Sequence, residues 1–191
     1  VHEKNKDAMK ALKENDLALT EDILQRDDDV DRLYFFVVRQ LKTAVVNRPL
    51  IGKMGLKGPQ DCLGYRLVAK SLERIADHAV KIAQAIQTIR GPIPAELLEF
   101  MMEVSAVAIN VCESAMKALS KVDVKLAQKS ISLAREIGVF EEKFTKRILE
   151  SEVGAQSMMG LRLIMESIRR MGEYGADIAE IAINLASDMK E

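Results

Sequence analysis

The chain has 191 residues, of which 48% are hydrophobic, 30% are charged and only 4% are aromatic. Its formal net charge is −1, so it lacks the positive field that gathers nucleic acid or anionic membrane. Its apolar runs are a few residues long, far below the roughly 20 that a membrane-spanning helix needs. We therefore expect no nucleic-acid binding and no membrane span from this segment, and the abundant Ala, Leu, Ile, Met, Lys and Glu are typical of a helical bundle.

The beginning of the chain and its cysteines indicate where the protein acts. The sequence starts at Val1, which suggests a fragment or a processed chain, and the opening VHEKNKDAMK has no apolar core of a secretion signal. Cys62 and Cys112 are too few for a disulfide framework in a chain of this size. We expect two buried thiols in a cytoplasmic protein.

Helix breakers divide the chain into six predicted helices. The strongest break is Gly91–Pro94, because proline removes a backbone donor and restricts the residue before it. Further breaks lie at Asn15–Asp16, Asn47–Pro49, Gly52–Pro59, Val122–Asp123 and Gly154. The predicted helices span 2–14, 16–47, 58–90, 94–121, 123–151 and 155–189.

Apolar residues recur at helical spacing within these stretches. The second stretch has an apolar residue every seven positions, and the last stretch has a similar stripe. The residues that form these stripes are Ile23, Val30, Val37 and Ala44, then Leu161, Ile164, Ile168, Met171, Ile178 and Ala182. Three amphipathic helices in each half can bury their stripes against one another.

The two halves of the chain are similar in sequence. The segment AMKAL at 8–12 recurs unchanged at 115–119, and residues 64–84 align without a gap to residues 160–180. The predicted fold is therefore all-α, with two tandem three-helix bundles produced by an internal duplication. We place the first bundle at 1–91 and the second at 92–191.

Two acidic pairs in the first half stand at four-residue spacing. Asp27 and Asp31 form one pair, Glu73 and Asp77 form the other, and each pair projects from one face of its helix. The two aspartates interrupt otherwise apolar rows, so they need a cation, a donor or water. If the two helices pack antiparallel, the four carboxylates converge into an oxygen-rich site of the kind that hard metal ions favour.

A solvated ion-pair network is the alternative interpretation of this spacing. Arg26, Arg32 and Arg74 lie close enough in sequence to pair with the acids. In the second half, Glu173 and Asp177 are weaker metal-binding candidates, because charged neighbours on the same helix face favour a solvated surface there.

Motifs of catalysis are not apparent in the sequence. No Ser, Cys or Thr stands in a nucleophile motif, no phosphate-binding loop is present, and neither histidine follows a glutamate by three residues as in di-iron bundles. We therefore assign no catalytic residue.

Around the acidic segments, the sequence resembles the PhoU family of phosphate-uptake regulators. The repeated motif of that family is approximately ERIGDHAxNIAE, and residues 73–84 read ERIADHAVKIAQ. The segment 26–33 resembles the acidic motif of the second helix in the family, and the resemblance extends over nearly the whole chain. It implies two three-helix bundles and carboxylates that bind a divalent or iron-type metal ion in some members. At matching positions these are Asp27, Asp31, Glu73 and Asp77.

Other parts of the sequence depart from that pattern or refine it. Arg169 replaces the glutamate of the motif in the second half, and Glu173 replaces its aspartate, so any metal is expected in the first half. The segment 59–66 resembles archaeal relatives, in which this unit often follows an AbrB-like DNA-binding domain.

The resemblance implies a non-catalytic function. We expect a negative regulator of phosphate uptake, acting as a signalling adaptor between a phosphate ABC transporter and a transcriptional response. Its partners would be proteins, including a second copy of the chain in a homodimer. Two alternatives are a carboxylate-bridged metalloenzyme and a plain helical oligomerisation module.

Overall fold

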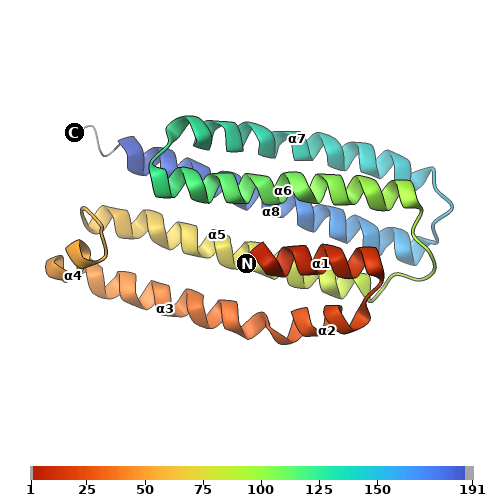
Figure 1. The fold of residues 1–191 in the computed structure, drawn as a ribbon, viewed down its shortest axis with the longest axis horizontal. Helices are drawn as coiled ribbons and strands as arrows, with labels where there is room; N and C mark the ends of the chain where they lie inside the picture. The colour runs from red at the N-terminus through yellow and green to blue at the C-terminus, as the bar shows by residue number, and fades with distance from the viewer. Residues whose placement is uncertain (1, 188–191) are drawn as a thin grey trace.

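The computed structural model describes residues 2–187, and within this range every regular element is an α-helix (Figure 1). Residues 1 and 188–191 and the side chain of Asp27 lie outside the described part. The helices are α1 (His2–Glu14), α2 (Leu17–Gln25), α3 (Asp27–Val45), α4 (Arg48–Lys53), α5 (Pro59–Ile86), α6 (Ala95–Lys121), α7 (Val124–Leu149) and α8 (Ala155–Ser187). The all-α prediction is confirmed.

The helices form two bundles that meet along α5 and α8 (Figure 1). In the first half, α5 packs against α1, α2 and α3, and in the second half α8 packs against α6 and α7. The two long helices α5 and α8 also pack against each other, and α1 contacts α6. The predicted pair of tandem bundles is thus the observed architecture.

The prediction of one helix over 16–47 is wrong, because the chain bends at Arg26 between α2 and α3. The Arg26 guanidinium lies 2.5 Å from a carboxylate oxygen of Asp22 and 3.1 Å from one of Asp7 in α1. The acidic run 27–29 then stands at the beginning of α3, where the helix dipole favours negative charge. The bend therefore has both a local and a tertiary cause.

The other helix boundaries agree with the prediction to within four residues, and one short helix was not predicted. That helix, α4, lies in the expected loop. The Asn47 side chain caps it by accepting a hydrogen bond from the Leu50 N–H at 3.3 Å. Pro49 fits its first turn, where no intrahelical donor is needed.

The two AMKAL segments end in the same turn. Asn15 and Val122 follow them with left-handed backbone conformations, at φ of 52° and 54°. The next residues, Asp16 and Asp123, cap α2 and α7 by accepting backbone hydrogen bonds through their side chains. The repeated sequence therefore produces a repeated turn.

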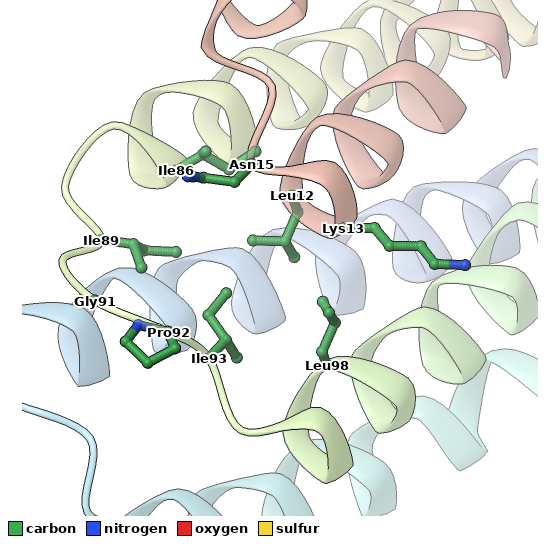
Figure 2. A pocket seen from close by; sticks show the side chains of 9 residues that line it. All are labelled: Leu12, Lys13, Asn15, Ile86, Ile89, Gly91, Pro92, Ile93 and Leu98. Carbon is green, nitrogen blue, oxygen red and sulfur yellow. The ribbon is translucent and has the colours of Figure 1, made fainter.

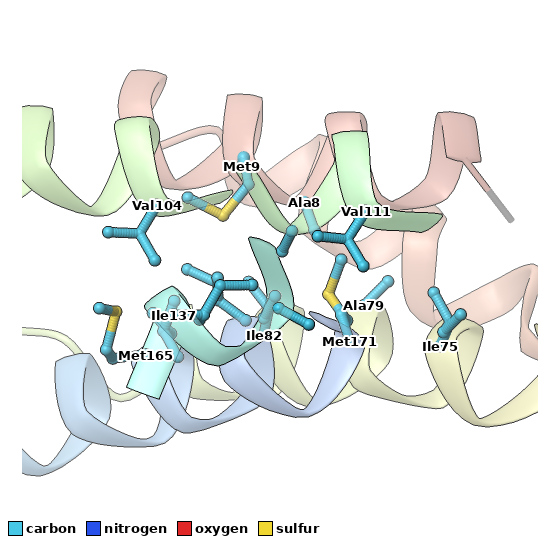
Figure 3. Packing of buried hydrophobic residues seen from close by; sticks show 14 of the residues in the cluster. Ala8, Met9, Ile75, Ala79, Ile82, Val104, Val111, Ile137, Met165 and Met171 are labelled. Carbon is cyan, nitrogen blue, oxygen red and sulfur yellow. The ribbon is translucent and has the colours of Figure 1, made fainter. Parts of the chain in front are cut away.

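One hydrophobic core runs through both halves (Figure 3). It includes Ile75 and Ile82 from α5, Val111 from α6, Ile137 from α7 and Met171 from α8, all almost fully buried. Burial of each such side chain contributes about 1.5–3 kcal/mol. Because the cluster crosses from one repeat to the other, the two bundles support each other.

An approximate two-fold relationship exchanges α5 and α8. A Cβ atom added at Gly64 would lie 3.3 Å from the side chain of Ile181. A Cβ atom added at Gly160 would lie 3.3 Å from the backbone oxygen of Ala85. Gly160 is the counterpart of Gly64 in the repeat alignment, and Ile181 corresponds to Ala85 when the alignment is extended by one residue. The contact of α5 with α8 is therefore made twice, once at each end of the helix pair.

Ser157 fixes the linker between the repeats. Its hydroxyl accepts a hydrogen bond from the Arg90 N–H at 2.7 Å and donates one to the Arg90 carbonyl at 2.8 Å. Ser157 is buried in the first turn of α8, so the segment leaving α5 is held against the beginning of α8.

Candidate metal centre

Three of the four predicted carboxylates come together between α3 and α5. One oxygen atom from each of Asp31, Glu73 and Asp77 lies within 4.8 Å of the other two. Glu73 is buried, and the two aspartates are half-buried. Asp27 is the first residue of α3, one turn before Asp31, but its side chain lies outside the described part. Among the described side chains, these three form the one group of acids, histidines or cysteines close enough to share an ion.

Lys70 pairs with one member of this group. Its Nζ lies 2.5 Å from Oε2 of Glu73, one turn away on α5, and 5.1 Å from the ring centre of Tyr34 on α3. The same Glu73 oxygen is buried and accepts no well-aligned hydrogen bond. The sequence interpretation assigned neither Lys70 nor Tyr34 to the site, although the three-residue spacing from Lys70 to Glu73 was visible in the sequence.

Two of the three arginines expected to neutralise the acids, Arg26 and Arg74, have other contacts. Arg26 pairs with Asp7 and Asp22. The guanidinium of Arg74 lies over the Tyr174 ring, 5.4 Å from its centre.

The donor set fits a hard cation. Oxygens bind Mg²⁺ or Ca²⁺ at about 2.0–2.6 Å, so two ligands of one ion lie up to roughly 5 Å apart. The observed spacing of 4.8 Å or less meets that limit. Asp31, Glu73 and Asp77 would hold such an ion, and water would complete its coordination. The ion would bridge α3 and α5.

The second half has arginines at the corresponding place. Arg169 is the counterpart of Glu73 in the repeat alignment, and Glu173 is the counterpart of Asp77. The Arg169 Nε lies 2.6 Å from Oε2 of Glu141 on α7, and its Nη1 contacts Glu173. Arg170 also pairs with Glu173, at 2.9 Å. The predicted candidate Glu173 thus lies among arginines, and the sequence interpretation did not find Glu141.

The other weak candidate, Asp177, lines a groove between α5 and α8. Partial burial, followed by the charge of Glu180, raises its pKa, while Arg74 opposes that rise. The structure brings Asp177 close to Arg74 and Glu180 rather than into a cluster of metal-binding carboxylates.

Two hollows of about 510 and 410 Å³ lie along α5 and α8, and we call them together the α5/α8 groove. They are related by the repeat: Leu67 lines one and its counterpart Leu163 lines the other. The residues of the groove are Tyr34, Arg66, Leu67, Lys70, Ser71, Arg74, Asp177, Glu180, Ile181 and Asn184, then His78, Lys81, Gln84, Ala85, Thr88, Leu163, Glu166 and Ser167. The wall from α5 carries its lysines, and the wall from α8 carries its acids.

His78 lies in this groove as a neutral residue. Burial, reinforced by the positive charges of Lys81, Arg170 and Arg169, lowers its pKa to about 4. Its imidazole is therefore uncharged at neutral pH.

A further hollow of about 350 Å³ lies beside the linker (Figure 2). Apart from Lys13 and Asn15, its lining is apolar or backbone. It offers no group of converging polar side chains, so we assign it no chemistry.

Within residues 2–187, no helix combines the length and the apolar content that a bilayer crossing needs.

The fold and the acidic cluster define a duplicated helical-bundle protein with a carboxylate cluster in one repeat. The PhoU domain family model matches residues 1–86 and 101–182, which is most of the chain. The chain belongs to the PhoU domain family, and the resemblance seen in the sequence is confirmed.

Individual relatives support the fold. A phosphate transport system regulatory protein PhoU from Streptococcus pneumoniae has 18% identity and a TM-score of 0.83, over 100% of this chain and 88% of that one. PhoU from Pseudomonas aeruginosa has 17% identity and a TM-score of 0.79, over 98% and 90% of the two chains. A PhoU homologue of Caulobacter vibrioides, described as a phosphate-specific transport system accessory protein, is 35% identical over 81 residues. That match covers 42% of this chain and 32% of the curated relative.

Proposed function

We propose that this protein is a non-catalytic, cytoplasmic regulator of phosphate uptake that links a phosphate ABC transporter to a transcriptional response. The observation that carries the proposal is the match to the PhoU family in both repeats. The curated relative that matches part of the chain is described as an accessory protein of a phosphate-specific transport system. The proposed regulation is negative: the protein restrains phosphate uptake when phosphate is plentiful.

The shape of the molecule supports docking rather than turnover. Its hollows are open surface grooves, and the acidic cluster has two half-buried members. A metalloenzyme would need an enclosed site with an open coordination position. Long helices with charged outer faces instead provide extended surfaces, and complementary charge steers protein partners onto such surfaces.

The regulator binds one hard divalent or iron-type cation at Asp31, Glu73 and Asp77. Three carboxylate oxygens within 4.8 Å of one another support this assignment. The ion would neutralise like charges that otherwise repel and would fasten α3 to α5. Metal occupancy would then control how firmly the outer helix of the first repeat is held.

The α5/α8 groove suits a second copy of the chain. A two-fold axis parallel to the helices would place the α5 wall of each copy opposite the α8 wall of the other. Lys81 and Arg66 on α5 of each copy would then face Glu166 and Glu180 on α8 of the other copy, so every contact would be made twice. Leu67 and Leu163 in the groove are about half exposed, at 51% and 48%, and such contact would bury them.

The regulatory function is tested by deleting the gene in its own host and measuring uptake of radiolabelled phosphate. We expect uptake to stay high in phosphate-rich medium, and the wild-type gene to restore the restraint. Co-purification from the complemented cells should recover a subunit of the phosphate transporter, identified by mass spectrometry. Unchanged uptake after deletion would contradict the proposal.

The metal assignment is tested separately by elemental analysis of purified protein after dialysis against a divalent cation. The double variant Asp31→Asn, Glu73→Gln should lose the bound ion. Glu166→Gln is the matched control, since it removes one exposed acid from α8 and should keep the wild-type metal content. Equal metal content in the wild type and the double variant would show that Asp31 and Glu73 do not bind the ion.

A further inference from the structure

The repeat alignment places a cation in the second half where the first half has a carboxylate. Arg169 corresponds to Glu73, and Glu173 corresponds to Asp77, with the same four-residue spacing. The duplicated backbone therefore presents two equivalent positions, one beside α3 and one beside α7.

The Arg169 guanidinium bridges α7 and α8. Its Nε lies 2.6 Å from Glu141 on α7, and its Nη1 contacts Glu173 on α8. The Arg169 side chain is 23% exposed and that of Glu141 only 17%. Glu141 also pairs with Arg162 at 3.1 Å, so these charges depend on one another rather than on water. A planar guanidinium can serve two carboxylates at once, which a lysine ammonium does less well.

The arrangement around Arg169 resembles a filled metal site. In the first half, Asp31 from the outer helix meets Glu73 and Asp77 from the central helix. In the second half, Glu141 from the outer helix and Glu173 from the central helix meet across Arg169. In each half, an outer helix and a central helix are thus joined by carboxylates around one position. In the second half, that position holds the guanidinium of Arg169, a positive charge that is covalently part of the chain.

We propose that Arg169 takes the place of a metal ion in the second repeat and permanently holds α7 against α8, so that only the first repeat responds to metal. The part of this inference that concerns the first repeat rests on the proposed function. Residues of the second repeat do not fit a metal ion while Arg169 is present, because a guanidinium repels a second cation from Glu141 and Glu173. Metal removal would loosen α3 from α5 and leave α7 on α8 unchanged.

The test is to restore the acidic residue of the motif and count Mn²⁺ ions. Electron paramagnetic resonance of free Mn²⁺ gives the number bound to wild type, to Arg169→Glu and to Arg39→Glu. Arg39 is exposed on α3 and is the matched control for the change of charge. We expect Arg169→Glu to bind one Mn²⁺ more than wild type, and Arg39→Glu to bind the wild-type number.

The variant Arg169→Ala covers the case in which three carboxylates prevent folding. It removes the guanidinium that joins Glu141 to Glu173 and leaves each acid only one ion-pair partner among the described residues, Arg162 or Arg170, so its melting temperature should rise with added Mn²⁺ more than that of Arg39→Ala. A folded Arg169→Glu protein that binds no additional ion would overturn the inference. So would failure of both Arg169 variants to fold in saturating Mn²⁺, because the ion would then be unable to replace the guanidinium.

The two proposals fail in different ways. If wild type binds no Mn²⁺ and Arg169→Glu binds one, the metal site of the first repeat is wrong and the function of Arg169 stands. If wild type binds one and Arg169→Glu also binds one, the first site stands and the inference is wrong. Repeating the count in the background Asp31→Asn, Glu73→Gln assigns the additional ion to the second repeat.

Discussion

His78 contacts Tyr174, its own counterpart in the repeat alignment, with ring centres 5.8 Å apart and ring planes inclined by 35°. A residue can contact its own counterpart only beside the axis that exchanges the two repeats. The axis therefore passes between these rings, at the middle of the α5–α8 contact. This explains why the α5/α8 groove consists of two related hollows, one on each side of His78 and Tyr174.

Close packing of α8 against α6 requires a glycine at position 175. A Cβ atom there would lie 2.9 Å from the Val111 side chain and 3.2 Å from the backbone nitrogen of Cys112. Backbone cannot move aside as a flexible side chain can, so Gly175→Ala should lower the free energy of unfolding by about 1–3 kcal/mol. Urea denaturation followed by circular dichroism measures this loss.

Gly138 is the control for that substitution. It lies within α7, and nothing stands within 4 Å of the position that its Cβ would occupy. Alanine is the better helix former, so Gly138→Ala should raise the free energy of unfolding by up to about 1 kcal/mol. Changes of the same sign in both variants would show that helix propensity, rather than packing, governs the two positions.

Lys70 should compete with any cation at the acidic cluster. Its ammonium lies 2.5 Å from Glu73, and a partly exposed ion pair of this kind is worth up to about 1 kcal/mol. We expect Lys70→Met to bind Mg²⁺ about two- to fivefold more tightly than wild type, measured by isothermal titration calorimetry. Lys42→Met, which removes an exposed lysine from α3, should bind as wild type does. Weaker binding by Lys70→Met would mean that the lysine supports the site instead.

Cys112 should make the protein sensitive to high pH. Its thiol lies 3.4 Å from the Met171 carbonyl, and burial raises its pKa to about 12 from its ordinary value of 9.0. Between these two values the unfolded chain loses the thiol proton while the folded chain keeps it. Stability from this residue is therefore complete below pH 9 and declines as the pH rises toward 12.

Replacing Cys112 should remove that contribution to the pH dependence. We expect Cys112→Ala to show a flatter fall of unfolding free energy between pH 9 and pH 11 than wild type, by urea titration at each pH. Cys62→Ala controls for loss of a thiol elsewhere in the chain. Parallel curves for wild type and Cys112→Ala would show that other groups cause the alkaline loss.

The carboxylate cluster was largely predictable because its members follow helical spacing. A four-residue interval puts Glu73 and Asp77 on one face whatever the tertiary structure is, and Asp31 interrupts an apolar row that must face a neighbour. The duplication likewise predicted two bundles from sequence identity alone. Whether the cluster binds metal stays a prediction.

What could not be predicted depends on contacts between distant segments. The bend at Arg26 relies on Asp7 in α1, and no local pattern indicates that the two meet. Glu141 was not predicted because the sequences of α3 and α7 cannot be aligned. Only the folded bundle brings Glu141 of α7 level with Arg169 of α8. Tertiary ion pairs of this kind leave no periodic signal in the sequence.

The proposed homodimer predicts that opposite charge reversals should rescue each other. The double variant Arg66→Glu, Lys81→Glu places two acids on the α5 wall opposite the acidic α8 wall, and Glu166→Lys, Glu180→Lys places two lysines on the α8 wall opposite the basic α5 wall. Each variant should repel its own copy and elute as a monomer in size-exclusion chromatography with light scattering.

A one-to-one mixture of the two variants should form a heterodimer with the mass of the wild-type dimer, since the introduced acids of one variant then face the introduced lysines of the other. Raising the salt concentration should weaken this pairing because exposed charges are screened within about 10 Å at 0.1 M. Dimers formed by each variant alone would place the interface elsewhere on the molecule. Wild-type protein that stays monomeric at tens of micromolar would contradict the homodimer itself, because the wild-type groove already carries the complementary charges on its two walls.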